Sequence, residues 1–287
     1  MLNYNQSFNI MIMGKYMGAH LKDLQSQNDN RGISLELVGI TKLALPLLIP
    51  SKNGDPKQVN ALVSFFTDLP HHSRGTHMSR FVEILYRNRL NHLTFKALKK
   101  IASEAKKKLK AENAYLEVSF TYLIEKQSPV SKKYSFVDYE CKTIFKVNCG
   151  DYEQRLIVKV PVLLLCPCSK AISKCNAHNQ RAMVTVDADL IDKFWIEDLI
   201  KLVEKEGSCE VYPLLKRPDE KYVTEKSYEN PKFVEDVVRD IALKLKNLAS
   251  IRSFIVECES YESIHNHNAY ARFTSNGVLR GGENANS

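Results

Sequence analysis

Three cysteines and one histidine fall within residues 166–181, which read CPCSKAISKCNAHNQR, in a chain that holds only seven cysteines and eight histidines. Thiolates and imidazoles are ligands that zinc and related divalent cations prefer, and a second thiol nearby can move protons. Pro167 disfavours helical geometry at Cys166, so Cys166 and Cys168 are expected at a strand end with their side chains on one side. This segment is the first candidate for a catalytic or metal-binding centre.

The residues alone leave several interpretations of this segment open. Cys166 and His178 would form a catalytic metal site if a third ligand came from elsewhere in the chain. Cys166, Cys168, Cys175 and His178 would make a structural zinc site, although C-x-C is a poor match for the usual C-x2–4-C pair. Buried free thiols are a further alternative. A disulfide is disfavoured, because seven cysteines is an odd number and the chain start does not read as a secretion signal.

Carboxylates gather in a second segment, Arg217–Val238, which reads RPDEKYVTEKSYENPKFVEDVV. Most of them are expected to be solvated, but a glutamate in the irregular polar part of this segment could complete a metal site with one cysteine and one histidine. Glu235 lies near the start of an expected helix, where the helix dipole favours a carboxylate. A carboxylate in that position can accept two N–H donors from a guanine-like edge.

Histidines mark two further segments. Residues 262–270 read ESIHNHNAY, and His265 and His267 would share a face if the chain is extended there, although a surface pair without a function is the alternative. Residues 75–83 read GTHMSRFVE and place His77 and Arg80 at an expected helix start, where a phosphate contact is possible.

The composition is that of a globular chain with a surplus of positive charge. Of its 287 residues, 44% are hydrophobic and 26% are charged, and the formal net charge is +8. A basic balance favours anionic partners such as nucleic acid, acidic membranes or phosphorylated small molecules. No run of about 20 apolar residues predicts a transmembrane span. The odd number of cysteines without a secretion signal leads us to expect the reducing cytoplasm.

Hydrophobic periodicity predicts strands and helices in a repeated order. The first half is expected to hold strands at 33–39, 43–49, 59–68, 115–124 and 134–147, with helices at 78–88 and 91–111. The second half is expected to hold strands at 152–165, 182–186, 251–259 and 269–273, with helices at 189–206 and 231–248. We interpret each half as a β-β-α-α-β-β unit, and the first half has one expected strand more than this order holds. We expect a flexible arm at residues 1–30, units at residues 31–149 and 150–276, and a disordered tail at residues 277–287.

This order predicts the α+β class, with antiparallel sheets that carry helices on one face. Such sheets expose long edges, which proteins often pair or close. A barrel built from several subunits is one solution.

Four long motifs together resemble the type IB GTP cyclohydrolase I family, in the family's order. They are LPHHSRGTHMSRFVE, LCPCSKAISKCNAHNQR, LLKRPDEKYVTEKSYENPKFVEDVVR and ESIHNHNAYA. The resemblance extends from about Arg31 to Phe273. It implies the tunnelling fold, with two units per subunit, multi-subunit barrels, a homotetramer, and active sites where subunits meet.

The resemblance also implies a reaction and a cofactor. GTP and water would give 7,8-dihydroneopterin triphosphate and formate, the first step of folate and pterin biosynthesis. The cofactor would be one divalent metal per active site, with zinc, manganese and iron as candidates. The triphosphate of GTP would use part of the positive charge, so neither nucleic acid nor a membrane is expected as a partner.

Roles carry over from the family motif by motif. Cys166, His178 and Glu220 resemble the metal ligands. Cys168 resembles the second active-site cysteine, assigned to proton transfer, and Glu235 looks like the carboxylate that anchors guanine. The two remaining predicted site residues, which would assist proton transfer or position water, are His265 and His267. Cys175 departs from the family pattern and is the residue that keeps a structural zinc site in consideration.

Two rival functions follow from the same residues. One is a metal-free nitrile reductase of the queuosine pathway, which shares the fold and uses a nucleophilic cysteine with NADPH. The other is a basic nucleic-acid-binding protein with a structural zinc, although no RRM signature is present.

Overall fold

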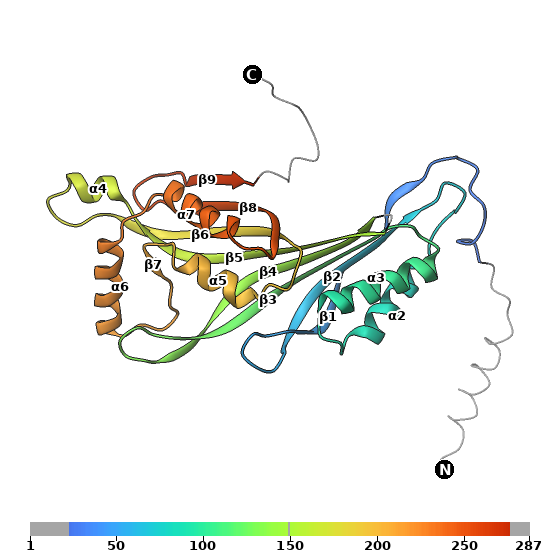
Figure 1. Cartoon of the computed structure of the whole chain (residues 1–287), viewed down its shortest axis with the longest axis horizontal. Coiled ribbons are helices and arrows are strands. Elements are labelled where there is room, and N and C mark those ends of the chain that lie inside the picture. The colour runs from blue at the N-terminus through green and yellow to red at the C-terminus, as the bar shows by residue number, and fades with distance from the viewer. Residues whose placement is uncertain (1–22, 149, 276–287) are drawn as a thin grey trace, which may run out of the picture.

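The computed structural model describes residues 23–148 and 150–275. Within them, the strands form one antiparallel sheet, and helices pack against it (Figure 1). The predicted α+β class with an antiparallel sheet is confirmed. Most of the predicted arm at residues 1–30, and the whole predicted tail at residues 277–287, lie outside the described residues.

The first half of the chain follows the predicted order. Its elements are β1 (Leu35–Ile49), β2 (Lys57–Leu69), α2 (Met78–Asn88), α3 (Phe95–Leu109), β3 (Ala114–Gln127) and β4 (Tyr134–Asn148). The sequence suggested two strands at 33–39 and 43–49, and this was wrong, because β1 is continuous. A register shift between Ile40 and Leu43 interrupts its pairing with β2, and Lys42 at the shift has a positive φ of 54°. The apparent break is therefore a bulge.

The second half is more elaborate than predicted. Its elements are β5 (Asp151–Leu165), α4 (Pro167–Ile172), β6 (Asn179–Leu190), α5 (Ile196–Glu204), β7 (Cys209–Glu210), α6 (Arg217–Glu229), α7 (Val234–Lys246), β8 (Ile251–Ser260) and β9 (Ala269–Thr274). The predicted helix at 189–206 begins too early, because β6 continues to Leu190. The polar segment read as irregular is helix α6, whose first turn accommodates Pro218.

Neighbouring strands in the sheet follow the order β1-β2-β3-β4-β5-β6-β8-β9, and β7 pairs with β5. Because β4 pairs directly with β5, one sheet runs through both halves of the chain. The pairing of β5 with β6 extends from Gln154–Leu190 to Leu165–Asn179. Eleven residues of extended strand span about 36 Å, so the two ends of this pair are far apart.

Burial alternates along the strands, which shows that one face of the sheet is covered. In β2, Val59, Ala61, Val63 and Phe65 are buried while the residues between them are more exposed. Helices α2 and α3 pack on the strands of the first half, and α5 and α7 pack on those of the second half (Figure 1). The buried side chains form one core. Among the described residues, no helix is long and apolar enough to cross a membrane.

Candidate functional site

The cysteine segment begins where β5 ends. Cys166 is the N-cap of α4 and has extended geometry, with φ −65° and ψ 116°, while Pro167 occupies the first turn. This confirms that Cys166 is held out of the helix. The backbone N–H of Ser169 donates to Cys166 Sγ at 3.4 Å, which orients the sulfur. Cys168 lies within α4 and is exposed, so the prediction that it shares a strand end with Cys166 was wrong.

His178 lies directly beside Cys166, because β6 starts at the next residue and pairs with the end of β5. The backbone N–H of Cys166 donates to the carbonyl oxygen of His178 at 3.1 Å. The backbone N–H of His178 in turn donates to Ser169 Oγ at 3.2 Å. Two of the three predicted metal ligands are therefore brought together by the strand pairing.

Gln180 orients the imidazole of His178, a role that the sequence analysis missed. Its side-chain NH2 donates to Ser260 Oγ at 3.2 Å and to Glu262 Oε1 at 3.1 Å, which leaves its Oε1 as an acceptor. That oxygen lies 2.9 Å from His178 Nδ1. Because an amide oxygen can only accept, Nδ1 is the donor in this bond, which leaves Nε2 as the ring nitrogen that could bind a metal.

The histidine pair lies in the loop between β8 and β9. The rings of His265 and His267 are stacked, with centroids 5.1 Å apart, and both side chains are exposed. The loop is anchored beside the start of β6, since Tyr261 N donates to Arg181 O at 2.9 Å and Ser263 Oγ donates to Gln180 Oε1 at 3.4 Å. The structure thus places this loop at the same end of the sheet as Cys166 and His178.

Glu220 lies in the first turn of α6 and is exposed. The other end of α6 touches α4, where the Lys170 ammonium lies over the Tyr228 ring at 4.3 Å. Eight residues of helix separate Glu220 from Tyr228, which corresponds to about 12 Å along the axis. Glu220 therefore lies at the end of α6 that is remote from α4.

Asp219 fixes the start of α6 against the hairpin between β3 and β4. Its buried carboxylate accepts the backbone N–H groups of Val130 and Ser131, each at 2.8 Å, and the hydroxyl of Ser131 at 2.5 Å. It also accepts the N–H of Lys216 at 2.8 Å. Burial opposes ionisation, but these hydrogen bonds prevail and hold the pKa of Asp219 below its usual range.

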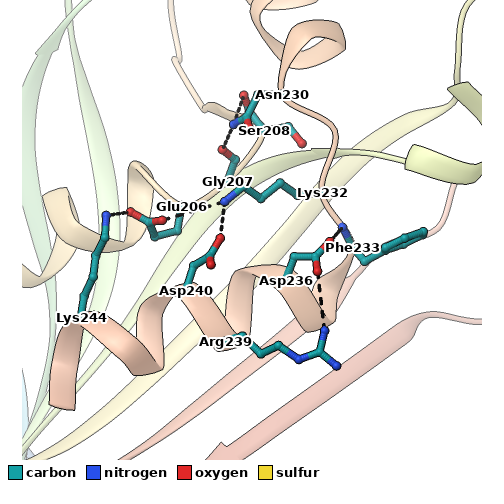
Figure 2. A network of polar contacts seen from close by, with 10 residues as sticks. All are labelled: Glu206, Gly207, Ser208, Asn230, Lys232, Phe233, Asp236, Arg239, Asp240 and Lys244. Atoms are coloured by element: carbon teal, nitrogen blue, oxygen red, sulfur yellow. Dashed lines mark hydrogen bonds and ion pairs between the residues drawn. The ribbon is translucent and has the colours of Figure 1, made fainter.

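Glu235 lies in the first turn of α7, also exposed, and its charge acts on the buried thiol of Cys258. Burial, together with that charge, raises the pKa of Cys258 to about 12. The entrance to α7 is held by Lys232, whose ammonium lies between Glu206 and Asp240 (Figure 2). Glu206 also pairs with Lys244.

The same network is tied to the strand end that precedes Cys166. The backbone N–H of Lys232 donates to Leu165 O at 3.1 Å, and the N–H of Leu165 donates to Ser208 Oγ at 3.0 Å. Asn230 Nδ2 donates to Gly207 O at 2.9 Å, as Figure 2 shows. These bonds set the position of the α7 entrance, which carries Glu235, relative to Cys166.

The predicted ligands do not all converge within this single chain. Across residues 23–148 and 150–275, no three or more His, Cys, Asp and Glu side chains lie close enough to hold a metal together. Cys175 is exposed in the α4–β6 connection, where its N–H donates to Ser173 Oγ at 3.2 Å. Neither the Cys3His arrangement nor the set of Cys166, His178 and Glu220 is formed by one copy.

The phosphate contact suggested at residues 75–83 lies in the first half of the chain. His77 is the N-cap of α2, and its Nε2 lies 3.3 Å from Asp23 Oδ2. Arg80 donates to Lys108 O at 3.0 Å, so its guanidinium is partly committed to the backbone. Both side chains belong to the first half, whereas the cysteine and histidine segments belong to the second.

Solved structures show the class of fold. The chain is similar to a uricase from Bacillus fastidious, with a TM-score of 0.54 and 8% identity over 84% of this chain and 93% of that one. It is also similar to urate oxidase from Bacillus subtilis 168, with a TM-score of 0.51 and 10% identity over 85% of this chain and 98% of that one. At such low identity the likeness shows the fold alone, which is the antiparallel α+β fold of the uricases.

Sequence comparisons show the family. Residues 21–271 match the family model described as Type I GTP cyclohydrolase folE2. GTP cyclohydrolase FolE2 of Thermosipho africanus is 48% identical over 251 residues, covering 88% of this chain and 96% of that relative. GTP cyclohydrolase FolE2 of Nitrosococcus oceani is 47% identical over 252 residues, covering 88% of this chain and 94% of that relative. The chain belongs to the type I GTP cyclohydrolase FolE2 family, and this name replaces the type IB label of the sequence resemblance.

Proposed function

We propose that this chain is a GTP cyclohydrolase that opens the imidazole ring of GTP by hydrolysis, releases formate and rearranges the product to 7,8-dihydroneopterin triphosphate. This reaction is the first step of folate and pterin biosynthesis. Membership of the FolE2 family, over nearly the whole chain, is the observation that carries the proposal. It favours the cyclohydrolase over the nitrile reductase and the nucleic-acid-binding protein.

Cys166, His178 and Glu220 would hold one divalent metal, either zinc, manganese or iron. The contact between Cys166 and His178 supports this assignment, and a sulfur, an imidazole and a carboxylate suit a borderline-soft cation. When bound, such an ion supplies a Lewis acid and lowers the pKa of a coordinated water towards about 7. Glu220 would have to join the other two ligands in the assembled protein, because α6 holds it away from them in one copy.

The remaining site residues would bind the substrate and move protons. Glu235 would accept the ring N–H and the amino group of guanine, since its exposed carboxylate at a helix start forms no ion pair with another described residue. Cys168 would protonate a leaving nitrogen at carbon 8, and the exposed pair His265 and His267 would assist that transfer or position water.

A homotetramer with active sites between subunits completes this proposal. The two outer strands of the described sheet, β1 and β9, have one paired side each, and such edges are available for pairing with another copy. Leu35 and Leu37 on β1 are 48% and 57% exposed. Such exposed apolar side chains support the proposal that another copy of the chain covers β1 in the assembly. Barrels made from two tunnelling-fold units per chain, residues 31–149 and 150–276, and a cytoplasmic location remain predictions.

The proposal is tested by incubating metal-reconstituted protein with GTP and measuring pterin fluorescence after oxidation. Wild type should form the pterin, and Cys166→Ala should form none. Cys175→Ala is the matched control, because Cys175 is an exposed thiol in the same segment with no assigned role. Equal activity of Cys166→Ala and wild type would overturn the role of Cys166, and consumption of GTP without a pterin would overturn the function.

A further inference from the structure

A cavity of about 420 Å³ lies at the end of the β5–β6 pair opposite Cys166 and His178. Its walls are the first residues of α3 and the segment from Leu190 to Ile196, which leads from β6 into α5. The volume falls within the range of small-molecule sites in proteins, about 300–1,000 Å³. The cavity shares no residue with the candidate GTP site and lies about 36 Å from it along the strands.

The lining of this cavity is rich in aromatic rings. Phe120 and Leu156 are buried and form part of the floor, while Phe95, Phe194 and Trp195 contribute to the walls. Aromatic side chains bind a planar ring through stacked or edge-to-face contacts. The shape and the lining therefore suit a flat aromatic molecule.

The charged side chains around the cavity favour an anion. Lys96 and Lys193 both line it, and neither has an ion pair with a carboxylate in the part of the chain that the structure describes. The Lys193 ammonium lies over the Trp195 ring at 3.7 Å. The helix dipoles of α3 and α5, whose first residues are part of the lining, add positive potential.

Three carboxylates lie near these lysines: Asp192, which is part of the lining, and Glu197 and Asp198 in the first turn of α5. Asp192 accepts the backbone N–H of Lys193 at 2.6 Å. Glu197 accepts from Ser51 at 3.0 Å and from Tyr122 at 2.6 Å, and Asp198 pairs with Lys52 at 2.5 Å. The lining therefore carries two lysines and one carboxylate, Asp192, so one positive charge remains in excess, and the acidic first turn of α5 is bound to groups outside the lining.

We propose that this cavity is a second binding site, separate from the GTP site, for a small planar aromatic anion such as an aromatic carboxylate or sulfonate. The ring enters between the aromatic side chains, and the anionic group pairs with Lys96 and Lys193. This inference does not depend on the proposed catalytic roles.

Trp195 is the only tryptophan of the chain, so its fluorescence reports on this cavity directly. The probe is 8-anilinonaphthalene-1-sulfonate, and N-phenyl-1-naphthylamine supplies the same rings without the charge. In the intact assembled protein, excitation of Trp195 should give saturable energy transfer to the sulfonate at one site per chain. The sulfonate should bind more tightly than the neutral probe, and added salt should reduce this difference.

Variants test the charge directly. The double variant Lys96→Gln and Lys193→Gln should lower the affinity for the sulfonate roughly five- to tenfold, as expected for the loss of two partly exposed ion pairs. Its affinity for the neutral probe should equal that of wild type. Lys100→Gln, on the same helix but outside the lining, is the control and should match wild type.

Three results would overturn the proposal. They are the absence of energy transfer from Trp195, an affinity for the sulfonate that the double variant does not change, and displacement of the sulfonate by GTP. The last result would make the cavity part of the substrate site.

Discussion

The backbone N–H of Cys166 donates to the carbonyl oxygen of His178 at 3.1 Å, and this bond joins two residues twelve positions apart in the sequence. The bond continues the β5–β6 ladder by one step beyond Leu165 and Asn179. The backbones of a cysteine and a histidine are therefore held next to each other by the sheet itself, at the position where we propose that both side chains bind the metal.

Separate roles for metal and substrate binding predict a clear difference between two variants. Cys166→Ala should lose bound metal and activity together. Glu235→Ala should raise KM for GTP by tenfold or more, as expected for the loss of a charged partner of two N–H donors, with metal occupancy near that of wild type. Metal analysis and steady-state kinetics on the same samples measure both. If Glu235→Ala emptied the metal site, the role of Glu235 would be wrong.

Gln180 should affect the metal without touching it. Gln180→Leu removes the oxygen beside His178 Nδ1, so the imidazole loses its fixed orientation, and metal affinity should fall roughly 10- to 100-fold. Competition with a chelator measures this affinity. Gln58→Leu on the exposed side of β2 is the control and should keep wild-type affinity. A Gln180→Leu protein with unchanged metal affinity would show that the hydrogen bond has no part in metal binding.

The position of Glu220 predicts that the site is completed by a neighbouring copy. Cys166→Ala and Glu220→Ala should each be inactive alone. In mixed assemblies, some sites would combine an intact Cys166 from one chain with an intact Glu220 from another, and activity should recover to about a quarter of wild type. Co-expression with two affinity tags and an assay of the doubly purified protein measure the recovery. Mixed assemblies without activity would require Glu220 to reach Cys166 within one chain.

The carboxylate of Asp219 should make the stability of the folded protein depend on pH in the acid range. Its pKa is lowered in the folded protein from an ordinary value of 3.8, so the stabilisation is present above that pH and is lost as the pH falls below it. Asp219→Asn should lower the Tm at neutral pH, and the difference from wild type should narrow below about pH 4. Thermal melts from neutral pH to below about pH 4 measure the difference in Tm. Asp138→Asn, at an exposed position, is the control. A difference in Tm that does not narrow in acid would contradict the ionised state of Asp219.

The sequence predicted the parts of the fold that depend on local pattern. Alternating burial in β3 and β4 is visible as alternating hydrophobic residues, and the turn residues mark the hairpins. Helix α6 escaped prediction because its sequence has no apolar stripe and Pro218 resembles a helix breaker. What stabilises its start is the carboxylate of Asp219 against a hairpin that lies far away in the sequence.

The candidate site shows the same limit. The pairing of Cys166 with His178 could be expected from a short connection between two strands. The contacts of Gln180 with Ser260 and Glu262 could not, because they require β6 to pair with β8. Strand order is a property of the whole sheet, and the spacing of residues within one motif carries no information about it.

The fate of carbon 8 of GTP tests the central claim most directly. Metal-reconstituted protein is incubated with GTP labelled with carbon-13 at that position, and the products are followed by NMR. The account predicts that the label appears in formate, with one formate released for each pterin formed. Label retained in the purine ring while the triphosphate is hydrolysed, or no reaction with any of zinc, manganese and iron, would contradict it.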